Sequence, residues 1–336
     1  MTADLDTAKA AFLAGRIEEA EAIMRAALPA QPAQAANDLG GLCVHAGRPR
    51  EGVGFLLKAL EIWPHWGMPR YNLAIAFLGL GLAELGWMLL EARRGIAELK
   101  APAPPFPFPE WRGEPLAGRH IVIMGEQGAG DQIMFARYMP VLAARGARVT
   151  FVCLDTLAGL LPASVAGVAR RVAADYWAPM MSLPYRLGPG AAIPPPAAIA
   201  LPPGSGRGVG VMAAGSPTHL NDLNRSPTGQ AAARLLALGR DLSPAATGAT
   251  TFRETAEIIS GLDLVISVDT AVAHLAASMG KPTWILIPAL GVDWRWGWTG
   301  ETTAWYPAAR LYRQPQPGAW SSVLDDVERD LAALLP

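Results

Sequence analysis

The sequence predicts a helical repeat domain followed by two α/β lobes with a cleft between them. Three observations predict this fold class: a repeat within the first hundred residues, a proline-rich break after it, and short apolar runs that then alternate with helical patterns. The chain has 336 residues, of which 51% are hydrophobic and 17% charged. It is therefore long enough to fill the cores of two or three domains.

The first hundred residues contain a repeated helical unit. Gly15-Arg16 recurs as Gly47-Arg48, and Pro32 recurs as Pro64, each 32 positions later. A period close to 34 with a terminal proline is typical of tetratricopeptide-type helix pairs. Such pairs stack because neither helix can bury its apolar face alone.

Composition and charge exclude several classes of protein. The formal net charge of −1 and the lack of a basic block argue against nucleic-acid binding. The apolar run at residues 71–90 is divided by Gly79 and Gly81, so it predicts a helical hairpin and not a membrane span. The polar, acidic first residues do not resemble a signal peptide. Cys43 and Cys153 have apolar neighbours and are expected to be buried free thiols in a reducing compartment. We therefore expect a cytoplasmic protein without a membrane span.

Changes in composition predict the domain boundaries. Five prolines in residues 101–111, "APAPPFPFPEW", cannot continue a helix and indicate a stiff linker. A second stretch rich in glycine and proline, residues 188–208, separates the two α/β lobes. The predicted parts are the helical domain at 1–100, the linker at 101–116, the N-terminal lobe at 117–205 and the C-terminal lobe at 206–336.

Short, fully apolar runs in the second part of the chain predict buried strands. Because such strands alternate with helical patterns, we expect parallel sheets covered on both faces. The expected strands are residues 120–124, 148–154, 208–213, 263–268 and 283–288. Examples of the expected helices are residues 132–145 and 270–279.

A glycine-rich loop, "MGEQGAGDQIMF", follows the first of these strands. Gly125, Gly128 and Gly130 have the spacing G-x-x-G-x-G, which is neither the dinucleotide fingerprint nor, without a lysine, a P-loop. The loop brings Asp131 to the first turn of a helix. Asp131 either favours the helix dipole or acts as a general base at the carboxyl edge of the sheet.

The segment at residues 261–282 predicts a strand, a turn and a helix. Thr270 and His274 are separated by one helical turn and lie opposite the apolar face of this helix. Periodicity therefore places His274 outside the core. It is either solvated or converges with Thr270 on an anion at the helix N-terminus.

Two further loops follow predicted strands at the same sheet edge. The loop at residues 213–227 is either a plain surface loop or a phosphate-binding loop in which Arg225, beside His219, neutralises a diphosphate. The loop at residues 288–307 contains clustered tryptophans, which either fill the core or form a stacking wall for a base or sugar. We favour the stacking wall. These tryptophans are Trp294, Trp296, Trp298 and Trp305.

Together these motifs resemble a known family. The segments "GEQGAGDQIMFARY", "NDLNRSP", "DLVISVDTAVAHLAASMGKPTWILIP" and "DWRWGWTGETTAWYPAARLYRQ" resemble the catalytic half of bacterial tetratricopeptide-repeat glycosyltransferases. That half is similar to the ADP-heptose heptosyltransferase family and has the two-lobed GT-B fold. The resemblance covers nearly the whole chain, and flagellin glycosyltransferases are one known type with this layout.

The resemblance implies an inverting, metal-independent glycosyltransferase. It would move a sugar from a nucleotide-sugar donor, bound by the C-terminal lobe, to a hydroxyl of a protein acceptor, possibly flagellin, docked by the helical repeats. The nucleotide sugar is a substrate, so no cofactor and no metal are expected. The alternatives are an inactive GT-B scaffold that binds a protein partner, and a transferase that acts on envelope saccharide.

The resemblance also implies roles for individual residues. Asp131 would be the catalytic base. The donor phosphates and sugar would be bound by Arg225, Asp269, Thr270, Ala271 and His274. Glu254 would hold the nucleotide, and Gly215 is expected beside it. The residues expected to line the cleft are Gln132, His219, Asp293, Trp294 and Trp296.

Overall fold

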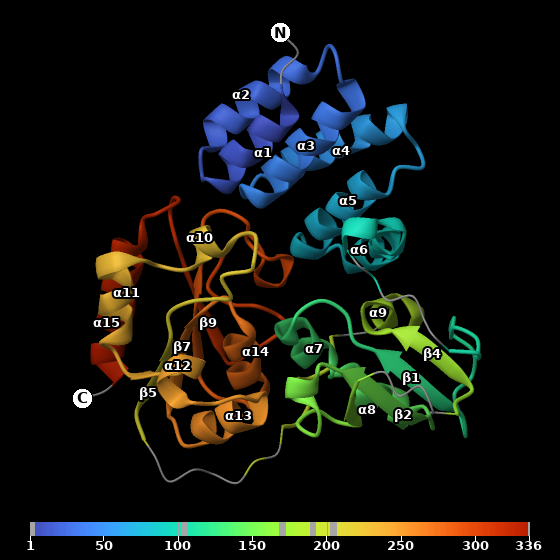
Figure 1. The fold of residues 1–336 in the computed structure, drawn as a ribbon, viewed down its shortest axis with the longest axis vertical. Helices are drawn as coiled ribbons and strands as arrows, with labels where there is room; N and C mark the ends of the chain where they lie inside the picture. Colours follow the sequence, from blue (N-terminus) through green and yellow to red (C-terminus); the bar gives the residue numbers. More distant parts are fainter. Residues whose placement is uncertain are drawn as a thin grey trace.

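The structure, a computed structural model, describes residues 4–99, 101, 106–167, 173–188, 193–199, 201 and 207–334. These residues form a helical segment and two lobes, each built on a parallel sheet, so the predicted fold class is confirmed. Figure 1 shows the helical segment above the two lobes, which lie side by side. No helix within the described ranges has the length and apolar character needed to cross a bilayer. The domain boundaries stay predictions.

The helical segment consists of antiparallel helix pairs. The first helix of each pair is followed by a glycine in the left-handed region, at Gly15 (φ 78°), Gly47 (φ 77°) and Gly81 (φ 79°), a conformation that other residues adopt only with strain. The pairs are α1 (Leu5–Leu13) with α2 (Ile17–Ala27), α3 (Pro32–His45) with α4 (Pro49–Ile62), and α5 (Gly67–Gly79) with α6 (Ala83–Leu90), followed by the 3-10 helices η1 (Glu91–Gly95) and η2 (Ala97–Leu99).

The first lobe has a parallel sheet with the strand order β3-β2-β1-β4 in the described residues. Strand β1 is buried at every position, as a strand covered on both faces must be. The strands are β1 (His120–Met124), β2 (Arg148–Cys153), β3 (Ser164–Ala166) and β4 (Tyr176–Pro179). The helices are α7 (Ala129–Phe135), α8 (Tyr138–Ala144), α9 (Leu183–Arg186), η3 (Asp155–Leu157) and η4 (Met180–Ser182).

The prediction of a single helix at residues 132–145 is wrong, because the helix is interrupted between α7 and α8. Pro140 lacks the N–H that a helix interior requires, and a new helix beginning at Tyr138 places it in the first turn, where that donor is not needed. At the break, the Arg137 side chain donates to the carbonyl of Met134 at 2.9 Å.

The second lobe has a parallel sheet with the order β6-β5-β7-β8-β9 in the described residues. The strands are β5 (Val209–Met212), β6 (Arg240–Asp241), β7 (Leu264–Val268), β8 (Thr283–Ile287) and β9 (Ala309–Arg313). The helices are α10 (Asp222–Arg225), α11 (Gly229–Leu236), α12 (Pro244–Thr247), α13 (Phe252–Ser260), α14 (Ala271–Ser278), α15 (Trp320–Leu334) and η5 (Trp294–Trp296). All five strands predicted from apolar runs are confirmed; β3, β4, β6 and β9 were not predicted.

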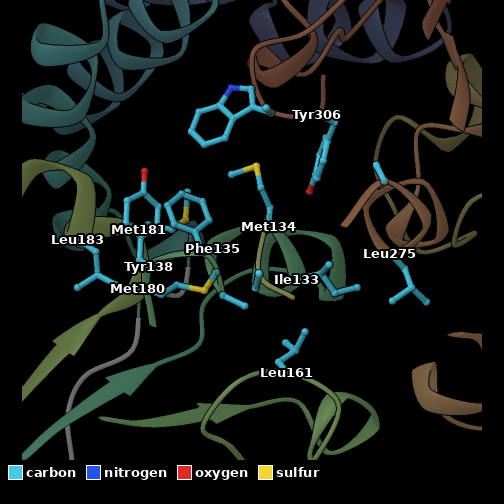
Figure 2. Close-up of a cluster of buried hydrophobic side chains, with 14 of the residues drawn as sticks. Ile133, Met134, Phe135, Tyr138, Leu161, Met180, Met181, Leu183, Leu275 and Tyr306 are labelled. Atoms are coloured by element: carbon cyan, nitrogen blue, oxygen red, sulfur yellow. The ribbon is translucent and has the colours of Figure 1, made fainter. Parts of the chain in front are cut away.

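Helix α7 joins the cores of the two lobes. In Figure 2 its residue Phe135 lies beside Met181 of the first lobe, whereas Ile133 and Met134 lie toward Leu275 and Tyr306 of the second. These side chains belong to one continuous hydrophobic cluster that also includes residues of α5 and α6. The three parts of the chain therefore share a core.

Two further sequence expectations concern the cysteines and the predicted linker. Cys43 and Cys153 are buried free thiols, as predicted, and burial raises the pKa of each to about 11. The end of the predicted linker packs on the first lobe, where Trp111 is fully buried and its backbone N–H donates to the carbonyl of Trp177 at 2.8 Å. Residues 102–105 of the linker, and most glycines and prolines of the 188–208 stretch, lie outside the described residues.

A buried ion pair connects the helical segment to the glycine-rich loop. Arg93 of η1 and Glu126 make two hydrogen bonds, of 2.8 and 2.9 Å, with both side chains almost completely inaccessible to solvent. Glu126 also accepts from the backbone N–H of Met181 at 3.0 Å. The loop that precedes α7 is thus anchored from two sides, by the helical segment and by the first lobe.

Removal of Arg93 is expected to destabilise the protein strongly. The substitution Arg93→Met leaves the Glu126 carboxylate buried without its main partner, so the free energy of unfolding should fall by about 3–5 kcal/mol. Because the double variant Arg93→Met/Glu126→Gln removes both charges, it should lose less than the sum of the single variants. Urea unfolding followed by tryptophan fluorescence measures both effects. Arg329, which forms an exposed ion pair, provides the control, since Arg329→Met should change stability by less than about 0.5 kcal/mol. Equal losses of stability in Arg93→Met and Arg329→Met would contradict the stabilising role of Arg93.

Candidate functional site

The loops that follow β1, β5, β7 and β8 meet where the two lobes contact each other. Helices α7 and α14 pack together at this junction (Figure 1). Beside this helix contact lies a cavity of about 600 Å³, here named cavity A. Its walls come from both lobes and include Gly128–Asp131, Gly215–Pro217, Arg225, Ala249–Phe252, Asp269–Val272, His274, Asp293 and Arg295.

Asp131 lies at the wall of cavity A that belongs to the first lobe. It occupies the first turn of α7, where one carboxylate oxygen accepts from the backbone N–H of Gly128 at 3.0 Å. The other oxygen forms an ion pair with Arg295 of the second lobe. Burial raises the pKa of Asp131, and the Arg295 guanidinium opposes that rise. The carboxylate is thus oriented by the helix terminus and by a charge from the other lobe.

Arg295 is a site residue that the sequence analysis missed. Its side chain is 5% exposed and bridges Asp131 and Asp293, with a distance of 2.7 Å to Asp293. Its guanidinium carbon lies 4.4 Å from the centroid of the Trp294 ring, a cation–π contact. The signal was present in the sequence, because the arginine of Asp-Trp-Arg-Trp stands in a loop at the carboxyl edge of a predicted strand.

Arg225 reaches cavity A from the opposite wall. Its guanidinium donates to the backbone carbonyl of Asp269 at 3.0 Å and to the carboxylate of Asp222 at 3.1 Å. A side chain at Gly215 would collide with it, since a Cβ there would lie 2.3 Å from Arg225 Nη2. Gly215 therefore makes room for the guanidinium, and the structure brings both predicted residues to the cavity.

The N-terminus of α14 opens into cavity A beside Arg225. Asp269 and Thr270 precede the helix, and Ala271 begins it. Burial, with a contribution from Asp293, raises the pKa of Asp269 to about 7. Gly130 allows α7 to approach this terminus closely, because a Cβ at Gly130 would lie 2.7 Å from the His274 ring.

His274 is buried, so the expectation that it lies outside the core is wrong. The interface with α7 and η5 covers the face of α14 that periodicity leaves polar, and only 6% of His274 remains exposed. Its ring stacks on Trp296 at a centroid distance of 5.1 Å and shares a 2.9 Å hydrogen bond with the Tyr306 hydroxyl. Burial, with Arg295 nearby, lowers the pKa of His274 to about 3. The imidazole that lines cavity A is therefore neutral at pH 7.

The expected tryptophan stacking wall is also wrong. Trp294, Trp296 and Trp305 are less than 8% exposed, and Trp294 and Trp305 pack edge-on against each other and against Trp87 of α6. They form core packing between the helical segment and the lobes. Trp294 still touches a second cavity with part of its surface.

Two other predicted residues do not line cavity A. Gln132 is buried behind the loop, where its side-chain oxygen accepts from the Leu154 backbone N–H at 2.9 Å, so the expectation that it forms the cleft wall is wrong. Glu254 lies in the first turn of α13 and accepts from the backbone N–H groups of Thr250 and Thr251 at 2.6 and 2.9 Å. It orients the residues beside the cavity and does not face into it.

A second cavity, here named cavity B, adjoins cavity A, and both are lined by Asp131, Arg225, Asp269 and Arg295. It measures about 590 Å³ and lies beneath the helical segment. Its walls include Phe12, Leu13, His45, Tyr71 and Ile75 of the helices, Gln127, Asp131 and Met181 of the first lobe, and Thr218–Asn221 and Gly291–Arg295 of the second. His219 and Asp293, both predicted cleft residues, line both cavities. Within the described part of the chain, no group of three or more His, Cys, Asp or Glu side chains is arranged to hold a metal ion.

Comparisons with known proteins relate part of the second lobe to glycosyltransferases. Residues 225–286 match the model of glycosyltransferase family 9 (heptosyltransferase). Protein FlbA of Caulobacter vibrioides is 27% identical over 164 aligned residues, which cover 37% of this chain and 28% of FlbA. The alignment thus spans less than a third of that relative.

Solved glycosyltransferases are distantly similar to the structure. The dodecameric, iron-containing glycosyltransferase TibC of E. coli is 12% identical with a TM-score of 0.47, covering 66% of this chain and 78% of TibC. The E. coli heptosyltransferase WaaC is 13% identical with a TM-score of 0.41, covering 64% and 99%. The O-GlcNAc transferase of Thermobaculum terrenum is 14% identical with a TM-score of 0.30, covering 96% and 81%. The match to the family model thus lies within the second lobe, where Arg225 and the start of α14 line cavity A.

Proposed function

We propose that the protein is an inverting, metal-independent glycosyltransferase that moves a sugar from a nucleotide-sugar donor to a hydroxyl of a protein acceptor. One observation carries this proposal: of the three carboxylates that line both cavities, only Asp131 belongs to the first lobe, and it is oriented by the Gly128 N–H and by Arg295. Cavity A would hold the donor, and cavity B leaves a separate approach to the same carboxylate.

The chemistry follows from this arrangement. The acceptor oxygen attacks the anomeric carbon while its proton passes to Asp131, and the bond from that carbon to the donor phosphate breaks. The leaving nucleoside diphosphate takes the electron pair. Burial favours this role, because a carboxylate with a raised pKa is a stronger base near neutral pH. Asp131 is therefore the proposed catalytic base.

The charges around cavity A support stabilisation of the leaving phosphate without a metal. Arg225 and Arg295 both line the cavity, and the N-terminus of α14 contributes backbone N–H groups and the positive end of its dipole. Guanidinium groups and helix termini stabilise phosphate oxygens as charge develops on them. The neutral His274 adds a polar group without adding charge.

The helical segment is the proposed acceptor-docking part. Its helix pairs have the period and turn glycines of tetratricopeptide-type repeats. Its backbone carbonyls accept two hydrogen bonds from the second lobe, one at His45 from the Gly291 N–H at 2.8 Å and one at Val44 from Trp298 Nε1 at 2.9 Å. An acceptor bound by these helices would therefore have a defined position relative to Asp131.

The variant Asp131→Asn is expected to lose transfer while it keeps donor binding. Loss of a general base costs about 10²–10⁴-fold in rate, whereas the amide retains the shape of the carboxyl group. Release of nucleoside diphosphate and mass spectrometry of a co-expressed acceptor measure transfer, and calorimetry measures donor affinity. The matched control is Asp293→Asn, which removes the other carboxylate beside Arg295 and should slow transfer far less. Unchanged turnover in Asp131→Asn would refute the assignment.

Donor affinity is expected to fall as the pH rises through about 7. Below this value Asp269 is protonated and neutral, and above it the carboxylate repels the donor diphosphate. The guanidinium groups of Arg225 and Arg295 stay charged over this pH range. The Asp293 carboxylate lies beside that of Asp269 and forms an ion pair with Arg295. Calorimetry with a nucleotide sugar from about pH 6 to about pH 8 measures the effect, which can reach about tenfold per pH unit above the pKa. The variant Asp269→Asn should bind with little pH dependence; the same decline in that variant would assign the effect to another group.

A further inference from the structure

Cavity B is walled by all three parts of the chain. The helical segment contributes Phe12, His45 and Tyr71, and these side chains face Asp131 and Asp293 across the cavity. Burial raises the pKa of Tyr71 to about 12, and the same two carboxylates add to the rise. The tyrosine hydroxyl therefore stays protonated near the proposed base, and the helical segment forms part of the site itself.

The face of the anomeric carbon that is attacked in the proposed reaction indicates which substrate enters cavity B. In an inverting displacement the acceptor oxygen attacks the face of the anomeric carbon opposite the leaving phosphate. Arg225 and Asp269 line both cavities, but Thr270–Val272 at the N-terminus of α14 line cavity A, so cavity A is the phosphate side. Cavity B reaches Asp131 from the helical side, so it is the route by which an acceptor hydroxyl would arrive.

Cavity B has exposed aliphatic side chains beside it. Leu220 and Leu13 of α1 both line the cavity and are 84% and 40% exposed, and Leu223, three residues after Leu220, is 80% exposed. Leu220 and Leu223 are the most exposed large hydrophobic side chains in the described ranges. Side chains of this kind, grouped beside a cavity, mark a binding surface.

The chemistry of the rim favours a polypeptide over a saccharide. Sugars are bound through aromatic faces and dense hydrogen bonding. Phe12, Tyr71 and Trp294 line the cavity, but the large hydrophobic side chains that are exposed beside it, Leu220 and Leu13, are aliphatic. Aliphatic side chains offer a sugar little. They bury the apolar side chains of a peptide well.

We propose that cavity B receives a polypeptide segment whose serine or threonine hydroxyl has an aliphatic residue beside it, and that Leu220, Leu223 and Leu13 hold that residue. The inference rests on the proposed function and specifies its acceptor. Tyr71 and His45 act as positioning residues on the helical wall, opposite the base.

The test uses peptide selection with the full chain. A library of randomised peptides, each with a central serine or threonine, is displayed against the protein saturated with the nucleoside diphosphate of whichever nucleotide sugar binds in calorimetry. Fluorescence anisotropy then gives the Kd of labelled selected peptides. The selected peptides should carry an aliphatic residue next to the hydroxyl.

The double variant Leu220→Ser/Leu223→Ser should weaken peptide binding roughly tenfold or more and leave nucleotide-sugar affinity unchanged. The matched control, Leu57→Ser/Leu334→Ser, alters two leucines with exposures of 49% and 56% that do not line cavity B, and it should bind like the wild type. Peptides without aliphatic preference, no selected peptides, or equal effects in both double variants would overturn the inference.

The same measurements separate this inference from the proposed function. If nucleotide sugars bind but the peptide results fail, cavity B is not the acceptor site and the donor site in cavity A stands. If no nucleotide sugar binds the wild-type protein, the proposed function itself fails, and the acceptor inference fails with it.

Discussion

The site depends on one buried guanidinium. Arg295 stands between a carboxylate of the first lobe, Asp131, and a carboxylate of its own loop, Asp293. A buried arginine with only one partner would be costly, whereas two carboxylates and the face of Trp294 compensate its charge. Because the pair spans the two lobes, it fixes their separation at the point where a donor sugar would lie. It also contributes to the low pKa of His274 and opposes the rise in that of Asp131.

The loop that carries Arg295 also connects the helical segment to the catalytic body. Trp298 donates to the carbonyl of Val44, and its ring occupies the space beside Gly79, where a Cβ would lie 1.3 Å from it. Arg313 of β9 supports the loop through the carbonyls of Trp296 and Gly297. One segment thus forms the wall of both cavities and holds the helices above them. The helical segment therefore contributes residues to the wall of cavity B.

Much of this architecture could be predicted from the sequence because it is encoded locally. Strands such as His120–Met124 are almost entirely apolar and are buried at every position, and the turn glycines and helix caps beside them mark where the chain reaches the sheet edge. That is why Asp131, Arg225 and the Asp269–His274 segment could be placed at one edge, where the structure brings them together in cavity A. Strand β6 was missed because two residues carry no periodicity.

The errors share a physical cause, which is long-range packing. The burial of His274 depends on α7 and η5, which are distant in sequence. The periodicity of its own helix therefore predicted an exposed side chain where the structure has a buried one. Trp294 and Trp305 are covered by Trp87, and the partner that makes Arg295 a site residue, Asp131, lies 164 positions earlier. Local pattern carries no information about such partners.

The most direct test of this account is a crystal structure of the protein with a bound nucleotide sugar. The account predicts the diphosphate at the N-terminus of α14 in contact with Arg225, and the anomeric carbon between that phosphate and Asp131, with its opposite face open toward cavity B. A nucleotide sugar bound elsewhere, or bound in cavity A with its anomeric carbon directed away from Asp131, would contradict it.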